Sequence, residues 1–152
     1  MLPRERLKAE ADKSIRLLVE CAKPLRPRTI ILFGSYARGD FTESSDIDLC
    51  IIAENMPKEE LARRTLPNLP SIPNVTALGF LPEEFLEYIK TTRFLAFDIV
   101  ADGIIIYDDG LYRKIRETFE DVTREEGIQR LRHGWKISKP TPSQQPLRPT
   151  LT

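Results

Sequence analysis

The sequence has little of several residue types that mark particular classes of protein. Only two of its 152 residues are cysteines, and Cys21 and Cys50 are spaced for neither a disulfide framework nor a metal-binding motif. No apolar run approaches the roughly 20 residues that a membrane-spanning helix requires. The charged N-terminus shows no apolar segment of a secretory signal. We therefore expect a cytoplasmic protein whose two thiols lie in or beside the core.

The chain also lacks an excess of either charge, because 23 lysine and arginine residues balance 23 aspartate and glutamate residues. No overall field attracts it to nucleic acid or to a membrane surface, so neither is an expected partner. The balance fails only from Gln129 onward, where five basic residues and Trp135 occur without any acid. We interpret this segment as a solvated basic tail, with contact to a partner or to nucleic acid as the alternative. The only histidine, His133, belongs to it and is expected at the surface.

Hydrophobic periodicity and turn residues predict an alternation of helices and strands. Helices are expected over residues 4–22 and 58–65, from 82 and from 111, with a helical turn at 36–39, and strands over 29–33, from 46, over 75–80 and over 104–107. This alternation is typical of an α/β or α+β domain, here a small mixed β-sheet flanked by helices. The domain is expected to occupy residues 1–137. Residues 138–152 are rich in Pro, Ser, Thr and Gln, which predicts a disordered tail.

Two polar groups flank the break between the first two predicted strands. Gly34 and Ser35 end the first strand, and Asp46 and Asp48 begin the second. A glycine lets the backbone approach a phosphate closely, and a serine hydroxyl with free backbone N–H groups can hold phosphate oxygens. Two carboxylates at alternate positions of a strand point to the same side and can bind hard divalent cations.

Each group on its own is more often an ordinary turn or a solvated strand edge than a site. Their combination is harder to explain by packing, because two like charges side by side on an apolar strand repel each other. A cation would relieve this repulsion. Cations bound there can polarise phosphoryl oxygens, as they do in sites that use two metal ions. The residues therefore predict a site for phosphates and a divalent metal at Asp46 and Asp48.

The segments Leu-Phe-Gly-Ser-Tyr-Ala-Arg-Gly-Asp and Ser-Ser-Asp-Ile-Asp-Leu resemble the motif of the polymerase-beta-like nucleotidyltransferase superfamily. They are most similar to its small prokaryotic members, the minimal nucleotidyltransferases. The resemblance is specific over residues 31–52 and extends more loosely as far as Trp135. It implies a nucleotidyltransferase fold that uses a nucleoside triphosphate as substrate and Mg²⁺ as cofactor, with two ions possible.

The resemblance also implies roles for particular residues. Gly34 and Ser35 would contact the nucleotide phosphates, while Asp46 and Asp48 would be catalytic and bind magnesium. Arg38 belongs to the matching motif as a nucleotide-site residue, and it would either contact a phosphate or brace the loop.

Active members of the superfamily generally use a third carboxylate, on a later strand, as the base toward the acceptor hydroxyl. The predicted third strand places residues 74–76 there, and none of them is acidic. Asp98 is the alternative candidate if residues 93–101 form a strand, whereas a helix, which the following Gly103 favours, would make it an ordinary helical residue. Weaker candidates flank a turn further on, and these are Asp102, Asp108 and Asp109.

Two functions follow as alternatives. The first is an enzyme that transfers a nucleoside monophosphate to a hydroxyl of a protein or small molecule, with the acceptor supplied by a protein partner or a second subunit. The second is a catalytically silent interaction module, which the resemblance suggests would be an antitoxin-like partner of a HEPN-type protein. The pair Asp46 and Asp48 favours the enzyme, and the missing third carboxylate favours the module.

Overall fold

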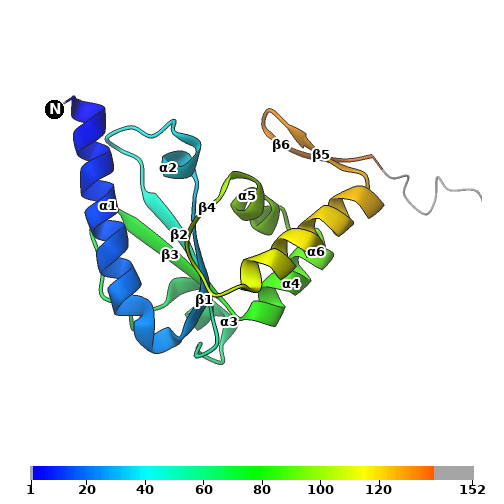
Figure 1. Ribbon diagram of the computed structural model, residues 1–152, viewed down its shortest axis with the longest axis horizontal. Helices are drawn as coiled ribbons and strands as arrows, with labels where there is room; N and C mark the ends of the chain where they lie inside the picture. Colours follow the sequence, from blue (N-terminus) through cyan, green and yellow to red (C-terminus); the bar gives the residue numbers. More distant parts are fainter. Residues whose placement is uncertain (1, 139–152) are drawn as a thin grey trace, which may run out of the picture.

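A four-stranded mixed β-sheet forms the centre of the protein in a computed structural model, which describes residues 2–138 (Figure 1). Its strands are β1 (Pro27–Phe33), β2 (Ile47–Ala53), β3 (Val75–Phe80) and β4 (Ile104–Asp108). Their order across the sheet is β3-β2-β1-β4, in which β1 runs antiparallel to β2 and to β4 whereas β2 and β3 are parallel. The two most apolar strands, β1 and β2, are therefore central, as expected for strands buried on both faces.

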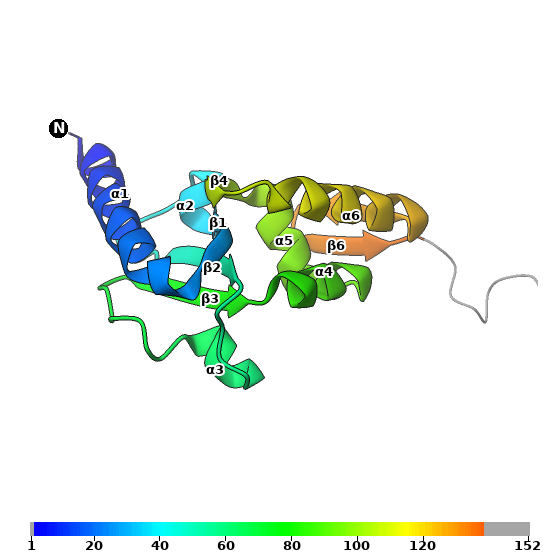
Figure 2. The ribbon, with the colours of Figure 1, turned by 60° about the horizontal axis from the view of Figure 1, so that its bottom comes forward.

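Helices cover both faces of this sheet (Figure 2). They are α1 (Pro3–Ala22), continued by a 3₁₀ turn η1 (Lys23–Leu25), α2 (Ser35–Arg38), α3 (Glu60–Thr65), α4 (Pro82–Lys90), α5 (Phe94–Asp102) and α6 (Leu111–Glu125). The long amphipathic helix α1 packs on one face, and α4, α5 and α6 pack on the other.

Strand alternation assigns the side chains of β2 to these two faces. Leu49 and Ile51 pack in the cluster under α1, whereas Cys50 and Ile52 pack in the cluster under α4–α6. Asp48 has the same parity as Cys50, so its side chain points to the α4–α6 side of the sheet at the end where β2 begins. This places the carboxylate at the edge of a core rather than on an open surface.

The predicted fold class and most predicted elements are confirmed. The third strand has the expected bounds, and the helix expected from Arg4 begins at Pro3. Cys50 is buried and Cys21 partly buried, as predicted. Within the described residues, no helix is long and apolar enough to cross a membrane. The predicted disordered tail, apart from Ser138, lies outside the described residues.

The interpretation of residues 129 onward as a solvated tail is wrong for the described part. Residues 128–137 form an antiparallel hairpin of β5 (Ile128–Leu131) and β6 (Gly134–Ile137). Trp135 packs edge-on against Phe97 and Phe119, with ring centroids 5.4 and 6.3 Å away, and Arg130 lies over the indole at 4.6 Å. These aromatic contacts attach the hairpin to the domain, although the basic composition of the segment gave no indication of such packing. His133, at the tip, is exposed as predicted.

Candidate functional site

The turn after β1 exposes backbone donors. Gly34 has a φ of +75°, which glycine adopts without strain, and helix α2 begins at the next residue. The N–H groups of Ala37 and Arg38 both donate to the carbonyl oxygen of Gly34, at 3.1 and 3.0 Å. The N–H groups of Ser35 and Tyr36 precede these bonds and have no acceptor within the turn. The turn thus offers two N–H groups and the Ser35 hydroxyl to a ligand.

Asp48 lies directly against this turn. It is the second residue of β2 and pairs in register with Phe33, the last residue of β1. A Cβ atom at position 34 would overlap Asp48 Oδ2, so glycine is the residue that permits this approach. The Gly-Ser and Asp-Ile-Asp segments predicted to act together are therefore in contact.

The carboxylates of Asp46 and Asp48 lack a bonded partner within residues 2–138. Asp46 is exposed and Asp48 is half-buried, and neither forms a hydrogen bond or ion pair with any described residue. Burial raises the pKa of Asp48 above its ordinary value and the charge of Asp46 raises it further, while the charge of Arg38 opposes them. The ionised pair is thus held at an electrostatic cost that a bound cation would remove.

The donor set fits magnesium. Carboxylate oxygens are hard ligands, and Mg²⁺ commonly combines one or two carboxylates with phosphate oxygens of the substrate. Among the described residues, no group of three or more His, Cys, Asp or Glu side chains gathers to form a metal site of protein ligands alone. A cation at Asp46 and Asp48 would therefore need ligands from a nucleotide or from water.

Arg38 makes the loop-bracing contact that was one of its two predicted roles. Its Nε donates to Asp40 Oδ2 at 3.3 Å across the exposed loop. The same guanidinium is close enough to Asp48 to lower the pKa of that carboxyl. Contact of Arg38 with a phosphate stays a prediction.

Three stacked side chains, those of Arg4, Phe41 and Tyr36, connect helix α1 to the turn, and the sequence did not predict this contact. The Arg4 guanidinium lies 4.2 Å from the Phe41 ring centroid and donates to the carbonyl oxygens of Gly39 and Phe41. Phe41 in turn stacks on Tyr36 of α2, with ring centroids 4.3 Å apart and planes within 5°. Helix α1 is thereby tied to the segment that carries Ser35. No local signal marks Arg4, because the contact spans more than 30 residues.

Residues 74–76, where a third carboxylate was expected, include no acidic residue. In the parallel pair of β2 and β3, Thr76 lies directly beside Asp48. The alternative candidate, Asp98, is wrong as a third ligand, because it lies on helix α5 and accepts a hydrogen bond from Trp135 Nε1 at 2.7 Å. Arg130 approaches it as well, at 3.5 Å.

The weaker acidic candidates also have structural partners. Asp102 is bound by Arg130 at 2.8 Å, and Asp108 accepts hydrogen bonds from Thr29 Oγ1 and from the N–H of Tyr112. Asp109 is bound by Arg28 at 2.6 Å. These carboxylates fasten neighbouring elements to one another, so none of them supplies the missing base.

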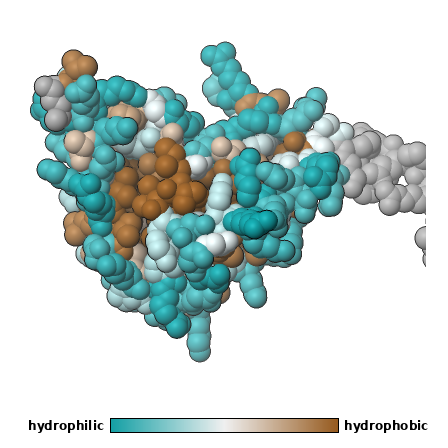
Figure 3. Space-filling view, in the orientation of Figure 1, coloured by the Kyte–Doolittle hydropathy of each residue, from teal (hydrophilic) through white to brown (hydrophobic). Residues whose placement is uncertain are grey.

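A large apolar hollow lies on the opposite face of the sheet from Asp48. Figure 3 shows apolar side chains gathered there, between α1 and the centre of the molecule. The cavity is about 700 Å³ and is lined by α1, by Leu32 of β1, and by Ile104 and Ile106 of β4, with Tyr36 and Phe41 at one end. The sheet therefore separates this cavity from the Asp48 carboxylate.

The glycine turn with its free donors and the neighbouring pair of aspartates are thus adjacent, which is the arrangement that the sequence predicts for a nucleotidyltransferase. The family model for the nucleotidyltransferase domain matches residues 15–132, and the chain belongs to this family.

Among individual proteins, the chain is 50% identical over 119 residues to "Putative protein adenylyltransferase MJ0604" of Methanocaldococcus jannaschii. This alignment covers 76% of the present chain and 93% of that protein. Shorter matches exist to MJ1305 and MJ0141 of the same organism, which bear the same description. They are 60% and 61% identical and cover 23% and 18% of this chain, but only 24% and 28% of those proteins.

A solved structure described as "Crystal structure of the toxin-antitoxin with AMP-PNP" aligns with a TM-score of 0.46 at 15% identity. The alignment covers 76% of this chain and 91% of that chain.

Proposed function

We propose that the protein transfers a nucleoside monophosphate from a nucleoside triphosphate to a hydroxyl group of another protein, in a reaction that depends on magnesium. The observation that carries the proposal is the contact between the Gly34 turn and Asp48, beside an uncompensated Asp46. Membership of the family supports the reaction type. The protein acceptor is supported by the description of the relative that matches over most of its length.

The reaction requires one bond to form and one to break. The acceptor oxygen attacks the α-phosphorus, the bond from this phosphorus to the bridging oxygen breaks, and pyrophosphate leaves with the bonding electrons. The hydroxyl proton is released to water, because the residue beside Asp48 is Thr76 and not a carboxylate. Bound magnesium would neutralise the charge that develops on the phosphates.

The chain's own residues position the nucleotide. The N–H groups of Ser35 and Tyr36, with the Ser35 hydroxyl, would bind the phosphates that become pyrophosphate. Asp46 and Asp48 would hold the metal, and Gly34 keeps the turn and the carboxylate in contact. Without a carboxylate base, catalysis would rest on positioning and electrostatics, which supply most of the rate in phosphoryl transfer.

The proposal is tested with ATP labelled on either the α- or the γ-phosphate, in an extract of soluble protein from the source cells. We expect α-label, and no γ-label, to remain on a denatured acceptor protein, and we expect the Asp46→Asn/Asp48→Asn variant to transfer none. Transfer of γ-label would identify a kinase instead. Equal labelling by the double variant would contradict the proposal.

Thr76 at the place of a third carboxylate favours a second candidate function. In this alternative the chain is a catalytically silent module that binds nucleotide or a protein partner without transferring anything. It predicts nucleotide binding that still depends on Asp46 and Asp48, but no labelled acceptor. Restoring the carboxylate with Thr76→Asp discriminates the two, because a silent module with an intact site would then gain transfer.

A further inference from the structure

We infer that the edge of β3 beside Thr76 binds the acceptor, and that this acceptor is an extended polypeptide segment that carries a hydroxyl side chain. The inference rests on the proposed function, since it assigns the acceptor side of the same site. It follows from three features of the structure: the side from which an acceptor can approach, one unpaired residue at the strand edge, and a groove along that edge.

The geometry of phosphoryl transfer fixes the side of approach. Attacking and leaving oxygens lie roughly in line on opposite sides of the phosphorus. The donors for the leaving phosphates come from the turn after β1, and Gly34 fills the β1 side of Asp48. The other flank of Asp48 is Thr76 of β3, whose side chain is exposed. An acceptor in line with the leaving group therefore arrives over β3.

The backbone of β3 has one residue free at its outer edge. The N–H of Val75 donates to the carbonyl oxygen of Ile72, and the carbonyl oxygen of Gly79 accepts from Arg64, so both residues face away from β2. Because this orientation repeats every second residue, Ala77 also faces outward. Neither its N–H nor its C=O has a partner within residues 2–138. An unpaired donor and acceptor on one edge residue match the backbone of another extended chain.

A groove of about 520 Å³ runs along this edge. It lies between residues 75–78 of β3 and the loop that follows α3, and it is lined mainly by apolar side chains, including Leu66, Leu69 and Ile72. The loop contains three prolines, Pro67, Pro70 and Pro73. Proline has no N–H to donate, which explains why the loop lies beside β3 without pairing along it.

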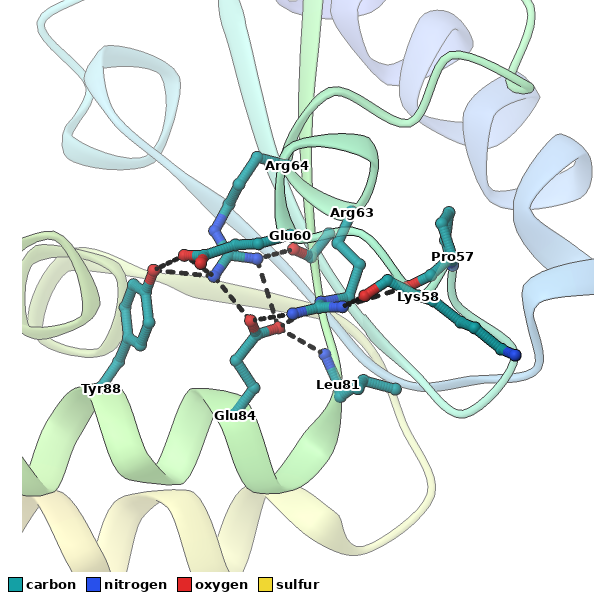
Figure 4. A network of polar contacts seen from close by, with 9 residues as sticks. Pro57, Lys58, Glu60, Arg63, Arg64, Leu81, Glu84 and Tyr88 are labelled. Atoms are coloured by element: carbon teal, nitrogen blue, oxygen red, sulfur yellow. Dashed lines mark hydrogen bonds and ion pairs between the residues drawn. The ribbon is translucent and has the colours of Figure 1, made fainter.

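A network of ion pairs lies at Gly79, toward the end of β3 away from Thr76 (Figure 4). Arg64 donates to the carbonyl oxygen of Gly79 at 2.9 Å and to Glu84 Oε2 at 2.8 Å, and Arg63 binds the same carboxylate at 2.9 and 2.8 Å. The network fixes α3 against α4. The open edge is therefore short, and it ends beside Thr76 at the carboxylates rather than running the length of the sheet.

An extended segment bound at this edge would place its side chains on both faces of the sheet. Its side chains alternate, so one beside Ala77 would enter the apolar groove on the α1 side, and a neighbour beside Thr76 would point to the face that Asp48 occupies. Two strand spacings, about 10 Å, separate such a neighbour from β2. A hydroxyl side chain at that position would face the α-phosphate.

The test uses the full chain, Mg²⁺, α-labelled ATP, and a library of acetylated, amidated heptapeptides of Val, Ile and Ala with one Ser, Thr or Tyr. Ala77→Pro removes the free N–H but leaves the bonds between β3 and β2 intact, because that N–H does not face β2. Ala77→Val, which keeps the N–H, is the matched control. We expect wild type and Ala77→Val to label the same peptides within twofold, and Ala77→Pro to label them at least tenfold less with unchanged nucleotide binding.

Other outcomes separate the two claims. No nucleotide binding by wild type would overturn the proposed function itself. Nucleotide binding with no transfer to a peptide or to a protein of the cell extract would likewise contradict the proposed transfer. Equal labelling by Ala77→Pro, transfer to a protein of the extract but to no peptide, or labelling of single amino-acid amides as well as peptides would overturn the edge inference. If Ala77→Pro does not fold, N-methylation of the preferred peptides takes its place, and we expect methylation at the residue that faces Ala77 to abolish labelling.

Discussion

Two acidic sites of the molecule, Glu84 and the pair Asp46 and Asp48, differ in whether neighbouring residues bond to their carboxylates. Burial alone would raise the pKa of Glu84, but hydrogen bonds from Arg63 and Arg64 and the N–H of Leu81 together lower it to about 2. Asp48 is also partly buried, yet no described residue bonds to its carboxylate, and its pKa is raised. Glu84 is bonded within the protein, whereas the Asp46–Asp48 pair is bonded to no described residue, as the proposed binding of a cation requires.

The largest expected effect comes from removing the glycine that lets the turn touch Asp48. In Gly34→Ala the new Cβ displaces the Asp48 carboxylate, because the two would overlap. We expect magnesium-dependent nucleotide affinity to fall on the order of 100-fold, or about 2.7 kcal/mol, measured by calorimetry. Gly110→Ala is the control, since Gly110 also has positive φ but nothing lies within 4 Å of a Cβ there. An equal loss in both variants would contradict the steric account.

The next effect concerns Glu84 and stability alone. Glu84→Gln leaves two largely buried guanidinium groups, with side chains 12% and 16% exposed, without their carboxylate. We expect the free energy of unfolding at pH 7 to fall by about 2–3 kcal/mol, measured by urea denaturation, with nucleotide affinity unchanged. The exposed Glu87→Gln on the same helix should have little effect on stability.

This ion-pair network also predicts a pH dependence. The pKa of Glu84 is lowered from 4.5 to about 2, so its contribution to stability is complete above pH 4.5 and is lost as the pH falls toward 2. The difference in unfolding free energy between wild type and Glu84→Gln should therefore shrink over that window. A difference that stays constant down to pH 2 would show that the ion pairs do not stabilise the protein.

A smaller effect of opposite sign is expected at Asp48. Asp48→Asn removes one of two like charges and a partly buried ionised group, so the metal-free protein should become more stable. We expect a rise of about 1–2 °C in melting temperature in the presence of EDTA. Asp12→Asn, an exposed carboxylate on α1, should change the melting temperature less. A lower melting temperature for Asp48→Asn would mean that its carboxylate has a structural role.

The sequence was sufficient to predict that these residues lie together, because they are close in the chain. Gly34, Ser35, Asp46 and Asp48 flank one strand break, and strand periodicity puts the carboxylates near the turn. The Asp98 alternative arose because short apolar segments have no decisive periodicity, and only the contact with Trp135 shows what Asp98 does.

The remaining features depend on contacts distant in sequence. Arg63 and Arg64 bind Glu84 about 20 residues away, and Arg4 reaches Phe41 across 37 residues. The hairpin was missed because its short strands are basic, and Trp135 stabilises it by packing on helices α5 and α6. Such contacts leave no spacing pattern in the sequence.

The measurement that tests the central claim most directly is calorimetry of ATP, GTP, CTP and UTP, each with Mg²⁺ and with EDTA, on wild type and on Asp46→Asn/Asp48→Asn. We predict that wild type binds at least one nucleotide only when Mg²⁺ is present, and that the double variant binds none. Equal binding by the double variant, or binding that persists in EDTA, would contradict the assignment of the two aspartates. Absence of binding by wild type to all four nucleotides would contradict a nucleotide site altogether.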